Sequence, residues 1–146
     1  MGDRTWLQLD VPKGNVAAVH DLFGYKAEEI DESPYSKNAK RLEYSEINYG
    51  GYSELENLAA LGIPFLAYSG DGGSYDSSIS AFDGFDRIDA ITTSHSGQPM
   101  IEVSEHGIES KTLKNAIEYF AVKERTIEAF NNYQIIGDQS CEKGKA

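Results

Sequence analysis

The chain has 146 residues, of which 40% are apolar, and a formal net charge of −11. This length suits one globular domain, which buries about 68–70% of its unfolded surface. The acidic balance argues against direct nucleic-acid binding, because a negative surface repels phosphates. No apolar run reaches the roughly 18 residues of a membrane span, and no apolar signal segment opens the chain, so we expect a cytoplasmic protein with no membrane partner.

The first part of the chain predicts a strand followed by a short helix. Residues 6–11 alternate between apolar and polar side chains, as a half-buried strand does. After Asn15, a possible helix cap, apolar residues recur at helical spacing over 16–23, and Gly24 provides the stop. His20 lies beside this stripe without a second ligand at metal spacing, which indicates a packing residue.

Residues 25–40 are densely charged and show no period of 2 or 3.6, so they predict a long loop. Such loops are uncommon in compact domains, so we expect this one to be mobile, a contact element, or an insert with a short helix at 27–30. Residues 41–49 alternate again and predict a second strand.

A capping box predicts the start of the next helix. The Ser53 hydroxyl can accept from the Glu56 amide while Glu56 reaches back to the Ser53 amide, so we expect the helix to begin at Ser53. Gly62 and then Pro64 provide its C-terminal stop. The apolar run 63–68 predicts a buried strand.

The second half predicts three strands and a long helix. The strands are expected at residues 77–82, 85–93 and 100–105, with Asp83-Gly84 as a two-residue turn, in an antiparallel meander. Ser110 can cap the last helix. Its apolar face is predicted to hold Leu113, Ala116, Ile117, Phe120, Ile127 and Phe130.

The resulting order, β-α-β-α-β-β-β-α, predicts the α+β class. We expect a mostly antiparallel sheet of about five to six strands, with the long C-terminal helix packed on one face. Residues 1–136 would form a single globular domain and residues 137–146 a disordered tail. Cys141, the single cysteine, lies in this tail and cannot form an internal disulfide.

No complete cofactor or metal motif is present, so we predict neither. The glycine-rich loop 69–76 lacks the lysine of a Walker motif and does not open a helix as a Rossmann fingerprint does. It also fails the EF-hand spacing, although a different calcium site through Asp71 and Asp76 is an alternative. His95 and His106 could each act with a nearby carboxylate, which makes a small enzyme the alternative function.

Residues 42–86 form an acidic window that contains eight carboxylates and no Lys or Arg. Such a cluster can imitate nucleic acid and fit a basic site on another protein, although a generic acidic surface is the simpler explanation. Tyr44 and Tyr68 lie within predicted strands and indicate core, whereas tyrosines at turns indicate contacts. The predicted partner-binding residues are Glu43, Glu46, Tyr49, Tyr52, Glu54, Glu56, Asp71, Tyr75, Asp76, Asp83 and Asp86.

Part of this window resembles a pattern in small uncharacterised proteins of phages, plasmids and other bacterial mobile elements. The resemblance lies in Asn48-Tyr49-Gly50, Leu55, Leu58, Gly62-Ile63-Pro64-Phe65 and Gly72-Gly73-Ser74-Tyr75. It implies an acidic inhibitor of host defence, of the anti-restriction or anti-CRISPR type, in the cytoplasm of a bacterial host. We therefore predict a non-enzymatic protein that occupies a basic nucleic-acid-binding site of a host-defence complex. A homo-oligomeric accessory module, such as a homodimer, is a further alternative.

Overall fold

The protein is described by a computed structural model covering residues 4–72, 75–93 and 95–145, with side chains as far as residue 132. A six-stranded sheet with the order β2-β3-β1-β4-β5-β6 forms its centre, and every neighbouring pair is antiparallel. This architecture confirms the predicted α+β class. The strands are Arg4–Pro12 (β1), Glu29–Glu32 (β2), Ala39–Asn48 (β3), Phe65–Ser69 (β4), Ser78–Phe82 (β5) and Arg87–Ile91 (β6).

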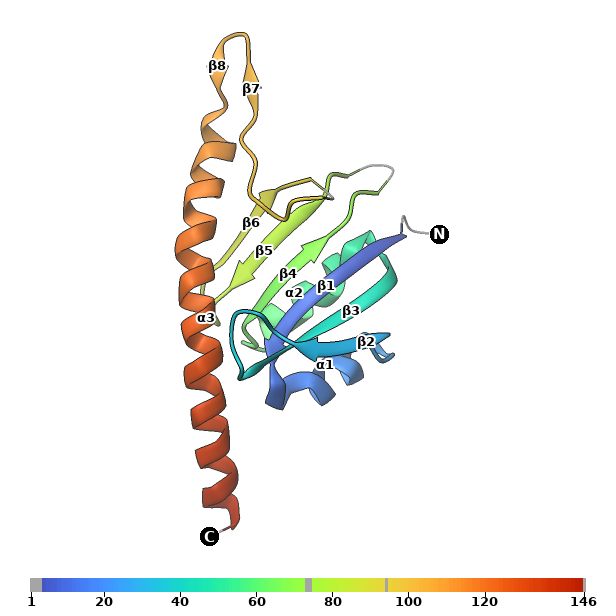
Figure 1. The fold of residues 1–146 in the computed structure, drawn as a ribbon, viewed down its shortest axis with the longest axis vertical. Helices are drawn as coiled ribbons and strands as arrows, with labels where there is room; N and C mark the ends of the chain where they lie inside the picture. Colours follow the sequence, from blue (N-terminus) through green and yellow to red (C-terminus); the bar gives the residue numbers. More distant parts are fainter. Residues whose placement is uncertain (1–3, 73–74, 94, 146) are drawn as a thin grey trace.

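Helices cover both faces of the sheet (Figure 1). Two short helices, α1 (Val16–Phe23) and α2 (Tyr52–Ala60), follow the 3-10 turns η1 (Lys13–Asn15) and η2 (Tyr49–Gly51) and pack on one face. The long helix α3 (Ser110–Lys145) packs on the other face, as predicted. No helix among the described residues combines the length and apolar character needed to cross a membrane.

The alternation of β1 separates two hydrophobic cores. Leu7, Leu9 and Val11 point toward α1 and α2, where they pack with residues such as Phe23 and Leu58. On the other face of the sheet, residues of β4, β5 and β6 pack against the α3 side chains Tyr119, Val122 and Phe130. Each fully buried side chain of this size contributes about 1.5–3 kcal/mol.

An edge strand occupies part of the predicted loop 25–40. β2 pairs with β3, and all four of its residues are exposed. Residues 27–30 therefore form no helix; the chain is extended there from Glu29. A strand exposed on both faces has no hydrophobic alternation, which is why periodicity missed it.

Two predicted helix caps are wrong. The predicted Ser53–Glu56 capping box does not form, because α2 begins at Tyr52 with Gly51 as its N-cap and without a side-chain cap hydrogen bond. At α3, the carboxylate of Glu109 accepts the amides of Lys111 and Thr112 at 2.7 and 2.9 Å, so Glu109 rather than Ser110 satisfies the first turn.

Only two strands of the predicted three-strand meander belong to the main sheet, as β5 and β6. After β6 the chain leaves the main sheet, and β7 (Val103–Ser104) pairs with β8 (Gly107–Ile108) in a separate ribbon at the N-terminal end of α3 (Figure 1). The turn between β5 and β6 has four residues, because Phe82 is the register partner of Arg87. The Asp83 carboxylate closes this turn by accepting the amides of Phe85 and Asp86.

The buried side of α3 is rotated from the predicted stripe. Thr126 and Tyr119 are buried, whereas Ile117 and Phe120 are 62% and 53% exposed. The side chains beyond Asn132, including that of Cys141, lie outside the described residues. The disordered tail at 137–146 stays a prediction.

Candidate functional site

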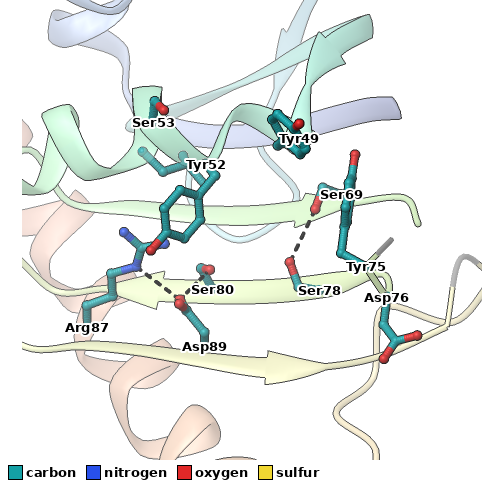
Figure 2. A pocket seen from close by; sticks show the side chains of 12 residues that line it. Tyr49, Tyr52, Ser53, Ser69, Tyr75, Asp76, Ser78, Ser80, Arg87 and Asp89 are labelled. Atoms are coloured by element: carbon teal, nitrogen blue, oxygen red, sulfur yellow. Dashed lines mark hydrogen bonds and ion pairs between the residues drawn. The ribbon is translucent and has the colours of Figure 1, made fainter. Parts of the chain in front are cut away.

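An open pocket of about 590 Å³ lies on the sheet beside α2 (Figure 2). It is on the face opposite α3, because Ser78 and Ser80 of β5 line it while Ile79 and Ala81 point into the α3 core. We call it the tyrosine pocket. Its lining residues are Tyr49, Gly50, Tyr52, Ser53, Leu55, Ser69, Tyr75, Asp76, Ser78, Ser80, Arg87 and Asp89.

A left-handed turn places Tyr49 at the pocket. Its φ is +51°, a region that costs a residue with a side chain about 1–2 kcal/mol. Gly50 is also left-handed, and a Cβ there would come within 2.8 Å of the Ser69 side chain, so the turn lies directly against β4. Backbone strain of this kind clusters at binding sites and persists where the surrounding packing enforces it.

Tyr52 and Tyr75 enter the pocket from two other segments. Tyr52 is the first residue of α2 and is 56% exposed. Its phenol hydrogen-bonds the Glu56 carboxylate, which raises the pKa of Tyr52. Tyr75 belongs to the loop between β4 and β5, and its ring centroid lies 5.8 Å from that of Tyr49. Aromatic rings from three separate segments therefore surround one hollow.

The floor of the pocket is polar. The Ser69 and Ser78 hydroxyl oxygens are 3.2 Å apart, and the Ser80 hydroxyl donates to Asp89 at 2.6 Å. The Arg87 Nε also donates to Asp89, at 3.0 Å, as the dashed lines of Figure 2 show. The described lining residues include neither His nor Cys, and the combination of aromatic walls with hydroxyls suits binding of a side chain or small polar group.

Five of the predicted contact residues are associated with this pocket. Tyr49, Tyr52, Tyr75 and Asp76 line it, and Glu56 joins it through the Tyr52 phenol. The structure thus brings together residues that are up to 27 positions apart in the sequence.

The other predicted contact residues are dispersed. Glu43 projects from the sheet face opposite its core neighbours Leu42 and Tyr44. Glu54 lies in the first turn of α2, and both Glu46 and Asp71 are exposed.

Asp83 and Asp86 both contact Arg125 of α3, at 2.9 and 3.7 Å. This contact lowers the charge of the acidic window, because α3 supplies a cation that the window lacks in sequence. Burial acts to raise the pKa of Asp83, but the amides of Asp86 and Phe85 and the Arg125 guanidinium outweigh it and lower that pKa.

Sequence reasoning missed the pocket floor. Ser78 and Ser80 resemble ordinary residues of the predicted strand 77–82, and Ser69 was assigned to the glycine-rich loop 69–76. Arg87 and Asp89 lie just beyond the acidic window. The available signal was the alternation of serine with apolar residues along β5, which marks one polar and one buried face.

The histidines lie away from the tyrosine pocket. The Nε2 of His20 accepts the Ala27 amide at 3.3 Å, which confirms a half-buried structural role. His95 is exposed, and the His106 Nε2 lies 3.3 Å from the Glu105 carboxylate on the β7–β8 ribbon, where both side chains are solvated. The two side chains of this His–carboxylate pair are 86% and 85% exposed, as in an ordinary surface pair.

One cluster of three carboxylates among the described residues has the spacing of a cation site. Oxygens of Glu29, Asp31 and Glu43 lie within 4.8 Å of one another. Strand register accounts for this, because Glu29 is the direct partner of Glu43 and Asp31 follows on the same face of β2.

No protein-family model matches this chain, and no curated protein or solved structure matches it significantly. The function is therefore inferred from the geometry of the site and from the sequence.

Proposed function

We propose that this chain is a non-enzymatic, acidic binding protein that places its tyrosine pocket against a basic surface of a protein partner. The observation that supports this most directly is the convergence of Tyr49, Tyr52 and Tyr75 on one open pocket. All three come from turns or a helix start, where side chains are accessible to a partner.

Tyrosine suits such a surface on physical grounds. Its ring offers a large, rigid contact area with few rotatable bonds, and tyrosine is enriched at the centres of interfaces. Arg and Lys side chains also bind over aromatic faces, with about 0.5–2 kcal/mol per contact. Carboxylates beside the rings, Asp76 and Glu56, strengthen the preference for a cationic group.

The overall charge supports the same partner class. A net charge of −11 accelerates encounter with a basic surface and disfavours direct contact with nucleic acid. The finer proposal is an inhibitor that occupies the nucleic-acid-binding site of a host-defence complex in the bacterial cytoplasm. It is supported by this charge and by the resemblance of residues 48–75 to mobile-element proteins.

Capture and affinity measurements test the proposal. The immobilised protein is used to isolate partners from a bacterial lysate, and the affinity of the purified partner is then measured for variants and at several salt concentrations. Tyr52→Ala and Tyr75→Ala should each weaken binding about tenfold or more, because aromatic anchors dominate interface energies. Affinity should also fall as salt rises.

Phe85→Ala is the matched control, because Phe85 is an aromatic residue that is 92% exposed and lies outside the tyrosine pocket. It should leave affinity unchanged. Equal losses for Phe85→Ala and the pocket variants, or an affinity independent of salt, would rule out the proposed mode of binding.

A further inference from the structure

The outer face of α3 has an apolar strip that nothing covers in the part of the chain described. Ile117 and Phe120, three residues apart on the helix, are the largest exposed apolar side chains of α3 between residues 110 and 132. The sheet-facing side of the same helix is made by Ala116, Tyr119, Val122 and Phe130. Figure 1 shows α3 running past both ends of the sheet, with its outer side turned away from every other element.

Charged residues of opposite sign flank this strip. Lys114, Ile117, Ala121, Glu124 and Glu128 recur at intervals of three and four residues, so they lie on one face of the helix, and Lys114, Glu124 and Glu128 are exposed. On this face Lys114 lies N-terminal to Ile117, and Glu124 and Glu128 lie C-terminal to Phe120. The two ends of this face therefore carry opposite charges, and its large apolar side chains lie between them. Lys114 also lies 3.9 Å from Glu118 of the same helix, in an exposed i,i+4 pair of the kind that contributes little to stability.

We propose that a second copy of this chain packs on this strip, with the two α3 helices antiparallel about a two-fold axis at the level of residue 119. Lys114 and Glu124 are each five residues from that level, about 7.5 Å along the helix. A two-fold rotation places Lys114 of one copy beside Glu124 of the other, and the pairing occurs twice. Ile117 is placed opposite the small Ala121 of the second copy by the same operation.

The charges select this orientation over the parallel one. Parallel packing in register would place Lys114 against Lys114 and Glu124 against Glu124, and like-charge contacts disfavour association. Antiparallel packing converts both repulsive contacts into attractive ones. A two-fold interface also buries the same patch on both copies, as is usual for homodimers.

The β7–β8 ribbon extends the apolar surface at one end of α3. Its cross-strand partners Val103 and Ile108 are both exposed, and isolated two-stranded ribbons are only marginally stable in water. A second copy lying along α3 would cover part of this surface. Ile117 and Phe120 are the only large apolar side chains exposed on α3 between residues 110 and 132, so we expect weak, reversible association rather than an obligate dimer.

Analytical ultracentrifugation over a wide range of concentrations tests the dimer. The native protein should show a reversible monomer–dimer equilibrium. Lys114→Glu should raise the dissociation constant about tenfold or more, because it reverses two symmetry-related contacts. Glu124→Lys should do the same, and the double variant Lys114→Glu/Glu124→Lys should restore the native value to within about threefold.

Lys26→Glu is the control, because it makes the same charge change at an exposed site between α1 and β2, outside α3, and should leave the equilibrium unchanged. Circular dichroism confirms that each variant is folded. A native protein that remains monomeric at millimolar concentration would overturn the dimer. Failure of the double variant to restore association would overturn the antiparallel pairing. Tyr52→Ala should have no effect on the equilibrium, which separates this inference from the proposed function.

Discussion

The Nε of Arg41 lies 2.8 Å from one carboxylate oxygen of Asp10, and its Nη2 lies 3.0 Å from the other. The two residues are register partners on β1 and β3, and Asp10 is only 1% exposed. The Ser33 hydroxyl donates a further hydrogen bond to Asp10 at 3.2 Å. The sheet therefore encloses a bidentate ion pair beneath α3.

Removing one partner of this pair should be costly. Arg41→Met leaves a buried carboxylate without its cation, and such changes cost about 3–5 kcal/mol. The double variant Asp10→Leu/Arg41→Met removes both charges and should recover most of this loss. Urea denaturation measures the three stabilities.

Lys40→Met supplies the control, because Lys40 pairs with the exposed Glu32 and surface pairs contribute about 0–1 kcal/mol. If the double variant were as unstable as Arg41→Met, the burial of the Asp10 charge would not be the source of the loss.

Removal of the phenol hydroxyl should change the stability of the protein in opposite directions at Tyr44 and Tyr68. The Tyr44 hydroxyl is buried without a hydrogen-bond partner within the described residues, whereas the Tyr68 hydroxyl donates to the Thr93 carbonyl at 3.0 Å. Tyr44→Phe should stabilise the protein by about 1 kcal/mol, because it removes an unsatisfied polar group. Tyr68→Phe should destabilise it by about 1 kcal/mol.

Thermal denaturation of both tyrosine variants provides the measurement. Burial also raises the pKa of Tyr44, so its hydroxyl stays neutral and the comparison can be made at any ordinary pH. A loss of stability in Tyr44→Phe would show that this hydroxyl is hydrogen-bonded in solution.

The sequence predicted the elements that have one buried and one exposed face. β1 was found because Leu7, Leu9 and Val11 alternate with polar residues, and the helices α1 and α2 were found from their apolar spacing and glycine stops. β2 was missed because an exposed edge strand has no such pattern. Tyr44 and Tyr68 were correctly predicted as buried or half-buried strand residues.

Features that depend on long-range contacts or on left-handed backbone conformations could not be predicted from sequence patterns. The predicted cap at Ser53 failed because η2 turns the chain through three left-handed residues into the helix one residue earlier. The buried side of α3 differs from the predicted stripe because it includes Thr126, a polar residue that an apolar pattern does not select. Thr126 can be buried because its hydroxyl donates to the Val122 carbonyl at 2.7 Å. The tyrosines of the pocket were found from their turn positions, but its serine floor depends on how β4, β5 and β6 pair.

Two glycines with similar backbone conformations should respond differently to alanine. Gly24 and Gly50 have φ of +84° and +62°, so alanine is strained at both by about 1–2 kcal/mol. A Cβ at Gly24 meets nothing within 4 Å, whereas at Gly50 it lies 2.8 Å from Ser69. Gly50→Ala should therefore cost about 1–3 kcal/mol more than Gly24→Ala.

Chemical denaturation of both glycine variants tests this difference. Gly50→Ala should also alter the tyrosine pocket, because the turn that positions Tyr49 must move away from β4. Equal losses of stability in the two variants would mean that the turn can shift without cost.

The cross-strand pair of Glu29 and Glu43 should make stability depend on pH. The two residues are register partners on β2 and β3, and like charges in that position are destabilising. Burial raises the pKa of Glu43 above its ordinary value of 4.5, and its hydrogen bond with Glu29 raises it further. A carboxyl with a raised folded-state pKa contributes stability below its unfolded pKa and loses that contribution as pH rises through the folded value.

Glu43→Gln removes the charge, so at pH 7 it should be more stable than the native protein by about 0.5 kcal/mol. The gain should shrink toward zero as pH falls to about 4. Melting temperatures measured across this range test the prediction, with Glu46→Gln on the same strand as a control that should show no gain. A gain that persisted unchanged at low pH would exclude charge repulsion as its cause.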